Sequence, residues 1–171
     1  SILQCKQELQ RPFIFHASDT ILKGSRTMIP ELNYVTGARK EESSQYRTLR
    51  LNNEDKLVKI NEQGELNFEL SYVGVAGIKD FELFFLNLEK LINNDYHDTS
   101  DVHVINEMLP EVDFTCIETE DWYDTGNTTE LHRTRKKFKS TIKVLDKKDE
   151  SIFLFDDFVI KFFFDAEINQ N

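Results

Sequence analysis

The chain has 171 residues, of which 39% are hydrophobic, and a formal net charge of −10. A chain of this length is about the size of one domain and can bury a core, and its 14 phenylalanines indicate a globular protein. The acidic balance argues against nucleic acid or an anionic membrane surface as the main partner. It does not exclude a phosphate ligand, because a divalent cation can mediate that contact.

The two cysteines, Cys5 and Cys116, are isolated and form no CxxC pair, so we expect reduced thiols in a cytoplasmic protein. No apolar run approaches the length of a membrane span, and no secretory signal is visible. The sequence also lacks an initiating methionine. Its first residues, 1–9, predict a helix that is broken at Arg11-Pro12.

Residues 13–17 form a short apolar run that predicts a buried strand, ended by Ser18-Asp19-Thr20. Asp19 therefore follows the carboxyl end of a strand, where it either takes part in chemistry or caps a turn. His16 lies inside the run, and we expect it to be packed rather than catalytic.

The middle of the chain predicts β-structure. Residues 34–36 favour a strand and 37–44 an exposed loop, whereas the alternation at 46–51 and 57–60, followed by a turn at 61–64, is typical of a hairpin or small meander. Residues 71–78 are β-rich but contain Gly74 and Gly77. Because glycine weakens a strand, the pair indicates either the close approach of a ligand or another backbone, or a bulge.

Two amphipathic helices are predicted next, at residues 81–92 and 101–109, the second ended by Pro110. A strand at 114–117 leads into Trp122-Tyr123-Asp124-Thr125-Gly126-Asn127. Asn127 and Glu130 have the spacing of a capping box, which starts a helix through Phe138. Asp124 thus lies at a strand-to-helix corner, where α/β proteins tend to bind ligands. The alternative is that Asp124 only stabilises the turn.

The C-terminal stretch differs in composition from the rest of the chain. Residues 143–150 are charged and favour a linker, and 151–171 predict a very apolar two-strand hairpin with an acidic turn at Asp156-Asp157. Such a hairpin is not stable alone. It either packs on the preceding domain or begins a second one.

The order of these pieces resembles the sugar-phosphate nucleotidyltransferase family, in particular its capsular-polysaccharide group, over residues 1 to 138. Three motifs carry the resemblance: a strand that ends in an acid, here Asp19; a strand with a glycine at the sugar, here Gly74; and the pattern W-x-D-T-G, which contains Asp124. The resemblance implies an α/β fold of the nucleotide-diphospho-sugar transferase type, incomplete, with a mixed, mostly parallel sheet flanked by helices.

The resemblance also implies a domain organisation. Residues 1–142 would be the C-terminal part of a nucleotidyltransferase domain, 143–150 a linker, and 151–171 the beginning of a kinase-like domain in which Lys161 meets phosphates. The alternative for Lys161 is an edge-strand lysine that discourages aggregation.

The implied activity is transfer of a nucleotidyl group from a nucleoside triphosphate to a sugar 1-phosphate, with release of pyrophosphate, for surface-polysaccharide precursors in the cytoplasm. Asp19 and Asp124 would hold Mg²⁺, which prefers carboxylate, phosphate and water oxygens. Gly74 and Glu62 would contact the sugar. Positioning and charge neutralisation supply most of the catalysis in such reactions. The partners would be the two substrates, with no nucleic acid or membrane, and a homo-oligomer is compatible with the sequence.

Two departures from the family bear on activity. The family's Glu-Lys pair before the glycine strand is Glu62-Gln63 here, and the Gly-rich, Arg-containing loop that wraps the triphosphate is absent from these residues. We therefore expect little or no turnover from this chain alone. The alternatives are a non-catalytic sugar-nucleotide-binding or scaffold remnant and a purely structural α/β domain. The Asp-Thr-Gly triplet also matches aspartic proteases, but that chemistry needs two such aspartates, and Asp19-Thr20 is followed by Ile21.

Overall fold

The computed structural model describes residues 2–22, 30–40, 44–94 and 99–138, together with the backbone of 143–147, 150–155 and 158–162. The chain divides into two compact units, Ser1–Asp124 and Thr125–Asn171. No helix within the described residues is long and apolar enough to cross a membrane.

The first unit is built on a six-stranded sheet with the order β5-β4-β6-β3-β7, in which β1 also pairs with β6. Its strands are β1 (Phe13–His16), β3 (Tyr34–Ala38), β4 (Thr48–Leu51), β5 (Leu57–Asn61), β6 (Leu70–Ile78) and β7 (Thr115–Glu118). Within the described part of this sheet only β3 and β7 are parallel. The prediction of a mostly parallel sheet is therefore wrong. A short connection joins the paired strands β4 and β5, whereas parallel neighbours need long crossovers; β6 pairs with β4 and not with β5.

The central strand is β6, and Gly74 lies at its irregular point. One edge of β6 pairs with β3, and the other pairs with β4 before Gly74 and with β1 after it. Gly74 has a φ of +77°, and its carbonyl accepts a hydrogen bond of 2.8 Å from the Ala17 N–H. A Cβ at this position would lie 2.8 Å from the Ala17 Cβ. The glycine therefore permits the close approach of another backbone.

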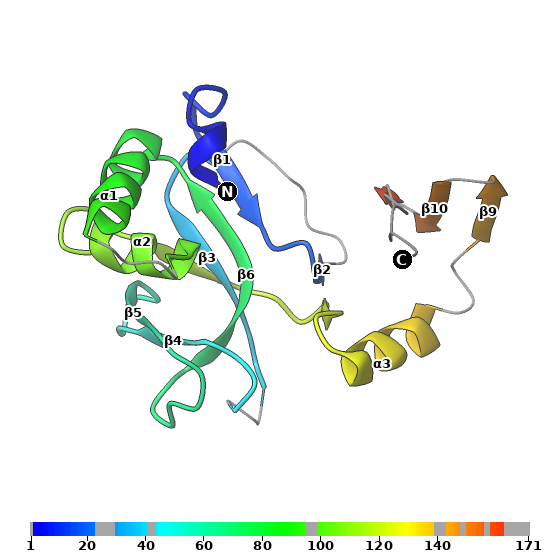
Figure 1. The fold of residues 1–171 in the computed structure, drawn as a ribbon. Coiled ribbons are helices and arrows are strands. Elements are labelled where there is room, and N and C mark those ends of the chain that lie inside the picture. Colours follow the sequence, from blue (N-terminus) through cyan, green and yellow to red (C-terminus); the bar gives the residue numbers. More distant parts are fainter. Residues whose placement is uncertain are drawn as a thin grey trace, which may run out of the picture. The chain divides into compact units, whose positions relative to one another are not determined.

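One face of the sheet is covered by α1 (Phe81–Asn93) and α2 (Asp101–Met108), which lie side by side in Figure 1. Both helices confirm the predictions from apolar periodicity. Phe13 of β1 packs against Phe84 and Phe85 of α1, with ring centroids 5.4 and 5.9 Å apart. Fully burying one such side chain contributes about 1.5–3 kcal/mol, so this cluster anchors the helical layer.

The other face of the sheet is covered by a two-stranded antiparallel ribbon of β2 (Thr20–Leu22) and β8 (Trp122–Asp124). Leu22 and Trp122 are buried there against Val73 and Val75 of β6. The Tyr46 ring meets the Trp122 ring edge-on, at 5.0 Å between centroids. Trp122 of the W-x-D-T-G motif is therefore a core residue of this layer.

Three local predictions need correction. The N-terminal segment is a 3-10 helix at Ile2–Cys5 rather than a helix through residue 9. Gly37 and Ala38, assigned to a loop, are buried in β3, and residues 41–43 of that loop lie outside the described residues. His16 is exposed rather than packed, because it ends the short strand β1; its Nδ1 lies 2.9 Å from the Ala17 carbonyl oxygen.

The second unit begins with α3 (Thr128–Phe138), followed by β9 (Lys143–Lys147), β10 (Glu150–Phe155) and β11 (Phe158–Phe162). The Asn127 side chain caps α3 by accepting a 2.9 Å hydrogen bond from the Glu130 N–H, as predicted. The predicted hairpin is present as antiparallel β10 and β11, although its acidic turn lies outside the described residues. Residues 143–147, assigned to a linker, form β9, which pairs with β10. The domain boundaries and the kinase-like assignment of residues 151–171 stay predictions.

Candidate functional site

The β2–β8 ribbon brings the two candidate metal ligands to the same end of one small layer. Its register pairs Thr20 with Asp124 and Leu22 with Trp122. Asp19 immediately precedes Thr20 and is exposed, whereas Asp124 is half-buried. The burial of Leu22 and Trp122 specifies this register, because a slip of either strand by one residue would turn its buried side chain away from the core. Two acids far apart in the sequence are thus neighbours in the fold.

Gly74 lies next to this end of the ribbon. The buried Thr20 hydroxyl donates a 2.7 Å hydrogen bond to the Val73 carbonyl, which ties β2 to β6. The Thr20 Oγ1 also lies 3.5 Å from where a Cβ of Gly74 would be. Three of the four candidate site residues, Asp19, Asp124 and Gly74, therefore gather around Thr20.

The donor chemistry of the two aspartates fits Mg²⁺ with a phosphate substrate. Magnesium is commonly held by one or two carboxylates, with phosphates and water completing the octahedron. Among the residues that the structure describes, no group of three or more His, Cys, Asp or Glu side chains could hold a metal ion. At Asp19 and Asp124, a metal would be held by the two carboxylates together with phosphate and water oxygens.

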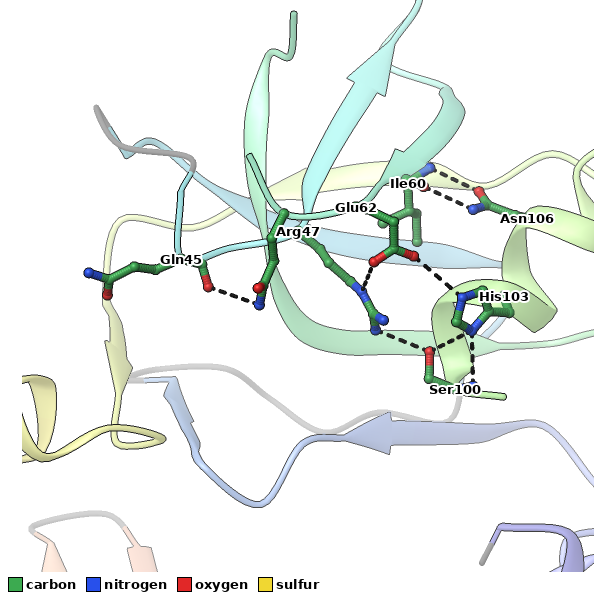
Figure 2. A network of polar contacts seen from close by, with 8 residues as sticks. Gln45, Arg47, Ile60, Glu62, Ser100, His103 and Asn106 are labelled. Carbon is green, nitrogen blue, oxygen red and sulfur yellow. Dashed lines mark hydrogen bonds and ion pairs between the residues drawn. The ribbon is translucent and has the colours of Figure 1, made fainter. Parts of the chain in front are cut away.

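Glu62 lies elsewhere, directly after β5, in a network of polar contacts with α2 (Figure 2). Its Oε2 accepts a 3.2 Å hydrogen bond from Arg47 Nε, and its Oε1 lies 3.4 Å from His103 Nε2. Arg47 Nη1 also donates to Ser100 Oγ at 3.1 Å. The link to the ribbon is indirect: Tyr46, the neighbour of Arg47, packs on Trp122.

A buried pair lies close to this network. The Tyr72 hydroxyl donates a 2.7 Å hydrogen bond to Asp101 Oδ2 at the start of α2. Burial raises the pKa of the Asp101 carboxyl, although the Tyr72 hydrogen bond and the Arg47 charge lower it in part. Burial likewise raises the pKa of Tyr72 well above its ordinary value. Arg47 therefore acts electrostatically on this buried pair as well as on Glu62.

A pocket of about 260 Å³ opens at the carboxyl ends of the parallel strands β3 and β7, a common location for ligands in α/β sheets. Its lining consists of Ala38, Arg39, Lys40, Glu118, Thr119, Glu120 and Trp122. Arg39 forms an ion pair with Glu118, with Nε 2.6 Å from Oε1. The Lys40 ammonium lies 4.9 Å from the Trp122 ring centroid. The buried Trp122 indole N–H has no hydrogen-bond partner within the described part of the chain.

Sequence reasoning missed this pocket and the partners of Glu62. Arg39 and Lys40 fell in a stretch read as a loop, and no local pattern sets them apart from other surface cations. A signal did exist in α2, because Ser100, His103 and Asn106 are spaced by three residues and so share one helical face.

Comparison with known proteins finds similarity in structure only. No family model matches the sequence, and no curated protein matches it. Solved nucleotidyltransferase structures, in contrast, have the same fold at low sequence identity.

Three of these structures illustrate the similarity. A glucose-1-phosphate thymidylyltransferase from Bacillus anthracis matches with a TM-score of 0.67 at 16% identity, over 79% of this chain and 58% of that one. CTP:phosphocholine cytidylyltransferase from Streptococcus pneumoniae matches with a TM-score of 0.63 at 13% identity, over 80% and 61%. The UTP-bound UGPase from Acinetobacter baumannii matches with a TM-score of 0.57 at 15% identity, over 81% and 59%.

The fold is thus the α/β fold of sugar-phosphate nucleotidyltransferases and their relatives. The chain spans 58–61% of the length of these three structures.

Proposed function

We propose that this chain carries the metal-binding and sugar-binding part of a nucleotidyltransferase that joins a nucleoside triphosphate to a sugar 1-phosphate. The observation that carries the proposal is the β2–β8 pairing, which brings Asp19 and Asp124 to one end of a ribbon within a nucleotidyltransferase fold. The UTP-bound relative supports a nucleoside triphosphate as one partner. Synthesis of surface-polysaccharide precursors in the cytoplasm is the proposed setting.

In the proposed reaction, an oxygen of the sugar 1-phosphate attacks the α-phosphorus of the nucleoside triphosphate. A new P–O bond forms, the bond from the α-phosphorus to the bridging oxygen breaks, and pyrophosphate leaves with its electron pair. The protein contributes mainly by positioning the substrates and stabilising charge. Magnesium, when bound, would neutralise phosphate charge and orient phosphate oxygens.

Each candidate residue has a separate task in this proposal. Asp19 and Asp124 would hold the metal, and the Thr20 hydrogen bond to Val73 would keep both acids in register. Gly74, with no side chain, would let the backbone approach the sugar, and it leaves room for the turn between β1 and β2 that carries Asp19. Glu62 would accept hydrogen bonds from the hydroxyl groups of the sugar.

The test is calorimetric binding of UTP and of UDP-sugars to the full chain, with and without Mg²⁺. Asp124→Asn should abolish the magnesium-dependent part of binding. The loss should exceed the roughly 10- to 100-fold change seen when an outer-shell partner is removed. Asp121→Asn is the matched control, because it removes the same charge nearby and can still accept the hydrogen bond from the Tyr123 hydroxyl. Equal effects of the two substitutions would refute the metal assignment.

The second candidate function is binding of a sugar nucleotide without catalysis. It is favoured by Gln63, which stands where the family has a lysine next to the sugar-site glutamate. Formation of a sugar nucleotide from a nucleoside triphosphate and a sugar 1-phosphate separates the two candidates. Magnesium-dependent binding without any product supports the non-catalytic candidate, and multiple turnovers support the enzyme.

A further inference from the structure

Four side chains from three parts of the fold form a closed circuit of polar contacts, hereafter the Glu62 circuit: Arg47, Glu62, Ser100 and His103 (Figure 2). We propose that Arg47 and His103 are positioning residues that orient the Glu62 carboxylate to accept hydrogen bonds from neighbouring hydroxyl groups of a sugar phosphate. This inference rests on the proposed function and adds the residues that prepare its sugar-binding acid.

The direction of the hydrogen bonds follows from the Ser100 backbone. The Ser100 N–H donates to His103 Nδ1 at 3.1 Å, so this nitrogen must be an acceptor. The proton of a neutral His103 therefore resides on Nε2, which faces Glu62 Oε1 at 3.4 Å. Arg47, which has only donors, faces Oε2 at 3.2 Å. Among the described residues, Arg47 faces one carboxylate oxygen and His103 the other, and each oxygen has a second lone pair that a ligand hydroxyl can use.

The two positioning residues are better buried than the group they hold. The side chains of His103 and Arg47 are 19% and 30% exposed, whereas that of Glu62 is 61% exposed. The Arg47 carbonyl is anchored by a 2.8 Å hydrogen bond from the Tyr72 N–H. Exposed ion pairs contribute little to stability. We therefore explain the contacts of Arg47 and His103 with the exposed Glu62 by a role in orienting its carboxylate toward a ligand.

Asn106 fixes the distance between the two elements that carry the circuit. Its side-chain amide accepts a 2.9 Å hydrogen bond from the Ile60 N–H and donates one of 2.9 Å to the Ile60 carbonyl (Figure 2). These bonds tie the end of β5 to α2 at Ile60, which lies two residues before Glu62 in the sequence. The backbone that carries the Glu62 side chain is therefore fixed against α2.

Gln63, the residue after Glu62, makes a contact outside the Glu62 circuit. Its side-chain amide donates to the Gln45 carbonyl at 3.3 Å, so it serves the contact between backbone segments rather than Glu62. The cation beside Glu62 comes instead from Arg47. Because the carboxylate charge is already balanced by a guanidinium, hydroxyl groups suit the remaining lone pairs better than a metal ion does.

The test compares affinity for a hexose 1-phosphate with affinity for inorganic phosphate, using the full chain in Mg²⁺ and the best-bound member of a hexose 1-phosphate panel. Arg47→Met should reduce the preference for the sugar phosphate roughly tenfold, the effect of one hydrogen bond to a charged group. Affinity for inorganic phosphate should stay unchanged. Arg47→Lys should restore part of the preference, and Arg50→Met, on the exposed face of β4, is the matched control.

A double variant separates positioning from general damage. If Arg47 acts through Glu62, then Arg47→Met should have no further effect once Glu62→Gln is present. An additive effect, or equal losses for both ligands, overturns the inference. Retention of the full sugar preference by Arg47→Met also overturns it and leaves the proposed function standing. A wild-type chain that binds no hexose 1-phosphate overturns the proposed function, and the inference with it.

Discussion

Substitution of Gly74 by alanine tests how the fold positions the candidate metal ligands. The residue has a φ of +77°, and holding a residue with a Cβ in the left-handed region costs about 1–2 kcal/mol. The added Cβ would also lie 2.8 Å from the Ala17 Cβ, and overpacking of this kind costs about 1–3 kcal/mol. We expect Gly74→Ala to lower the free energy of unfolding by about 2–5 kcal/mol.

Gly64→Ala is the matched control, because Gly64 has a similar φ of +88° but no atom within 4 Å of its Cβ position. It should cost only the conformational part, about 1–2 kcal/mol. Urea unfolding followed by tryptophan fluorescence of Trp122 measures both changes. Replacing Ala17 by glycine in the Gly74→Ala background should recover the steric part. Equal costs at Gly64 and Gly74, or no coupling between Ala17 and Gly74, would refute the reasoning.

Three further predictions concern one helix cap and two partly buried titratable groups. Asn127→Ala removes the cap of α3 and should cost about 0.5–2 kcal/mol, visible as faster hydrogen exchange of the α3 amides; unchanged exchange would contradict the cap. Burial raises the pKa of Asp101 above its ordinary 3.8, so the stability linked to its proton is present at low pH and is lost as pH rises through the folded pKa. The free energy of unfolding of Asp101→Asn minus that of the wild type should therefore be larger at pH 7 than at pH 3. The same difference at both pH values would argue against this reasoning. Burial, with Asp55 and Glu118 nearby, raises the pKa of Cys116 to about 11. Iodoacetamide at pH 8 should therefore label the exposed Cys5 before Cys116, and equal rates of labelling would contradict this prediction.

Local pattern was sufficient for most of the elements of the fold. The apolar spacing of residues 81–92 and 101–109 predicted α1 and α2, and Asn127 with Glu130 predicted the start of α3. These signals depend on neighbours three or four residues apart, which a sequence shows directly. Strand direction is not such a signal. The short connection between residues 46–51 and 57–60 nevertheless pointed to antiparallel pairing of β4 with β5, and the fold-level resemblance outweighed it.

The candidate site depended on contacts between distant parts of the chain. Asp19 and Asp124 were linked in advance only by resemblance, and the structure supplies the physical reason for their proximity, the pairing of β2 with β8. Arg47 was missed because nothing near it in the sequence indicates that it meets Glu62, and for His103 the three-residue spacing in α2 indicates a shared face but not the partner. Glu62 itself was assigned to the sugar by resemblance, and that assignment stays a prediction.

The β2–β8 pairing also has a consequence for synthesis on the ribosome. Its two strands come from opposite ends of the first unit, so β2 must wait for nearly the whole unit to be translated before its partner emerges. Pairings between distant segments form late, since their ordering cost precedes any gain from contact. A nascent chain stalled before Trp122 would carry Asp19 without Asp124, and β2 would have no β8 strand to pair with.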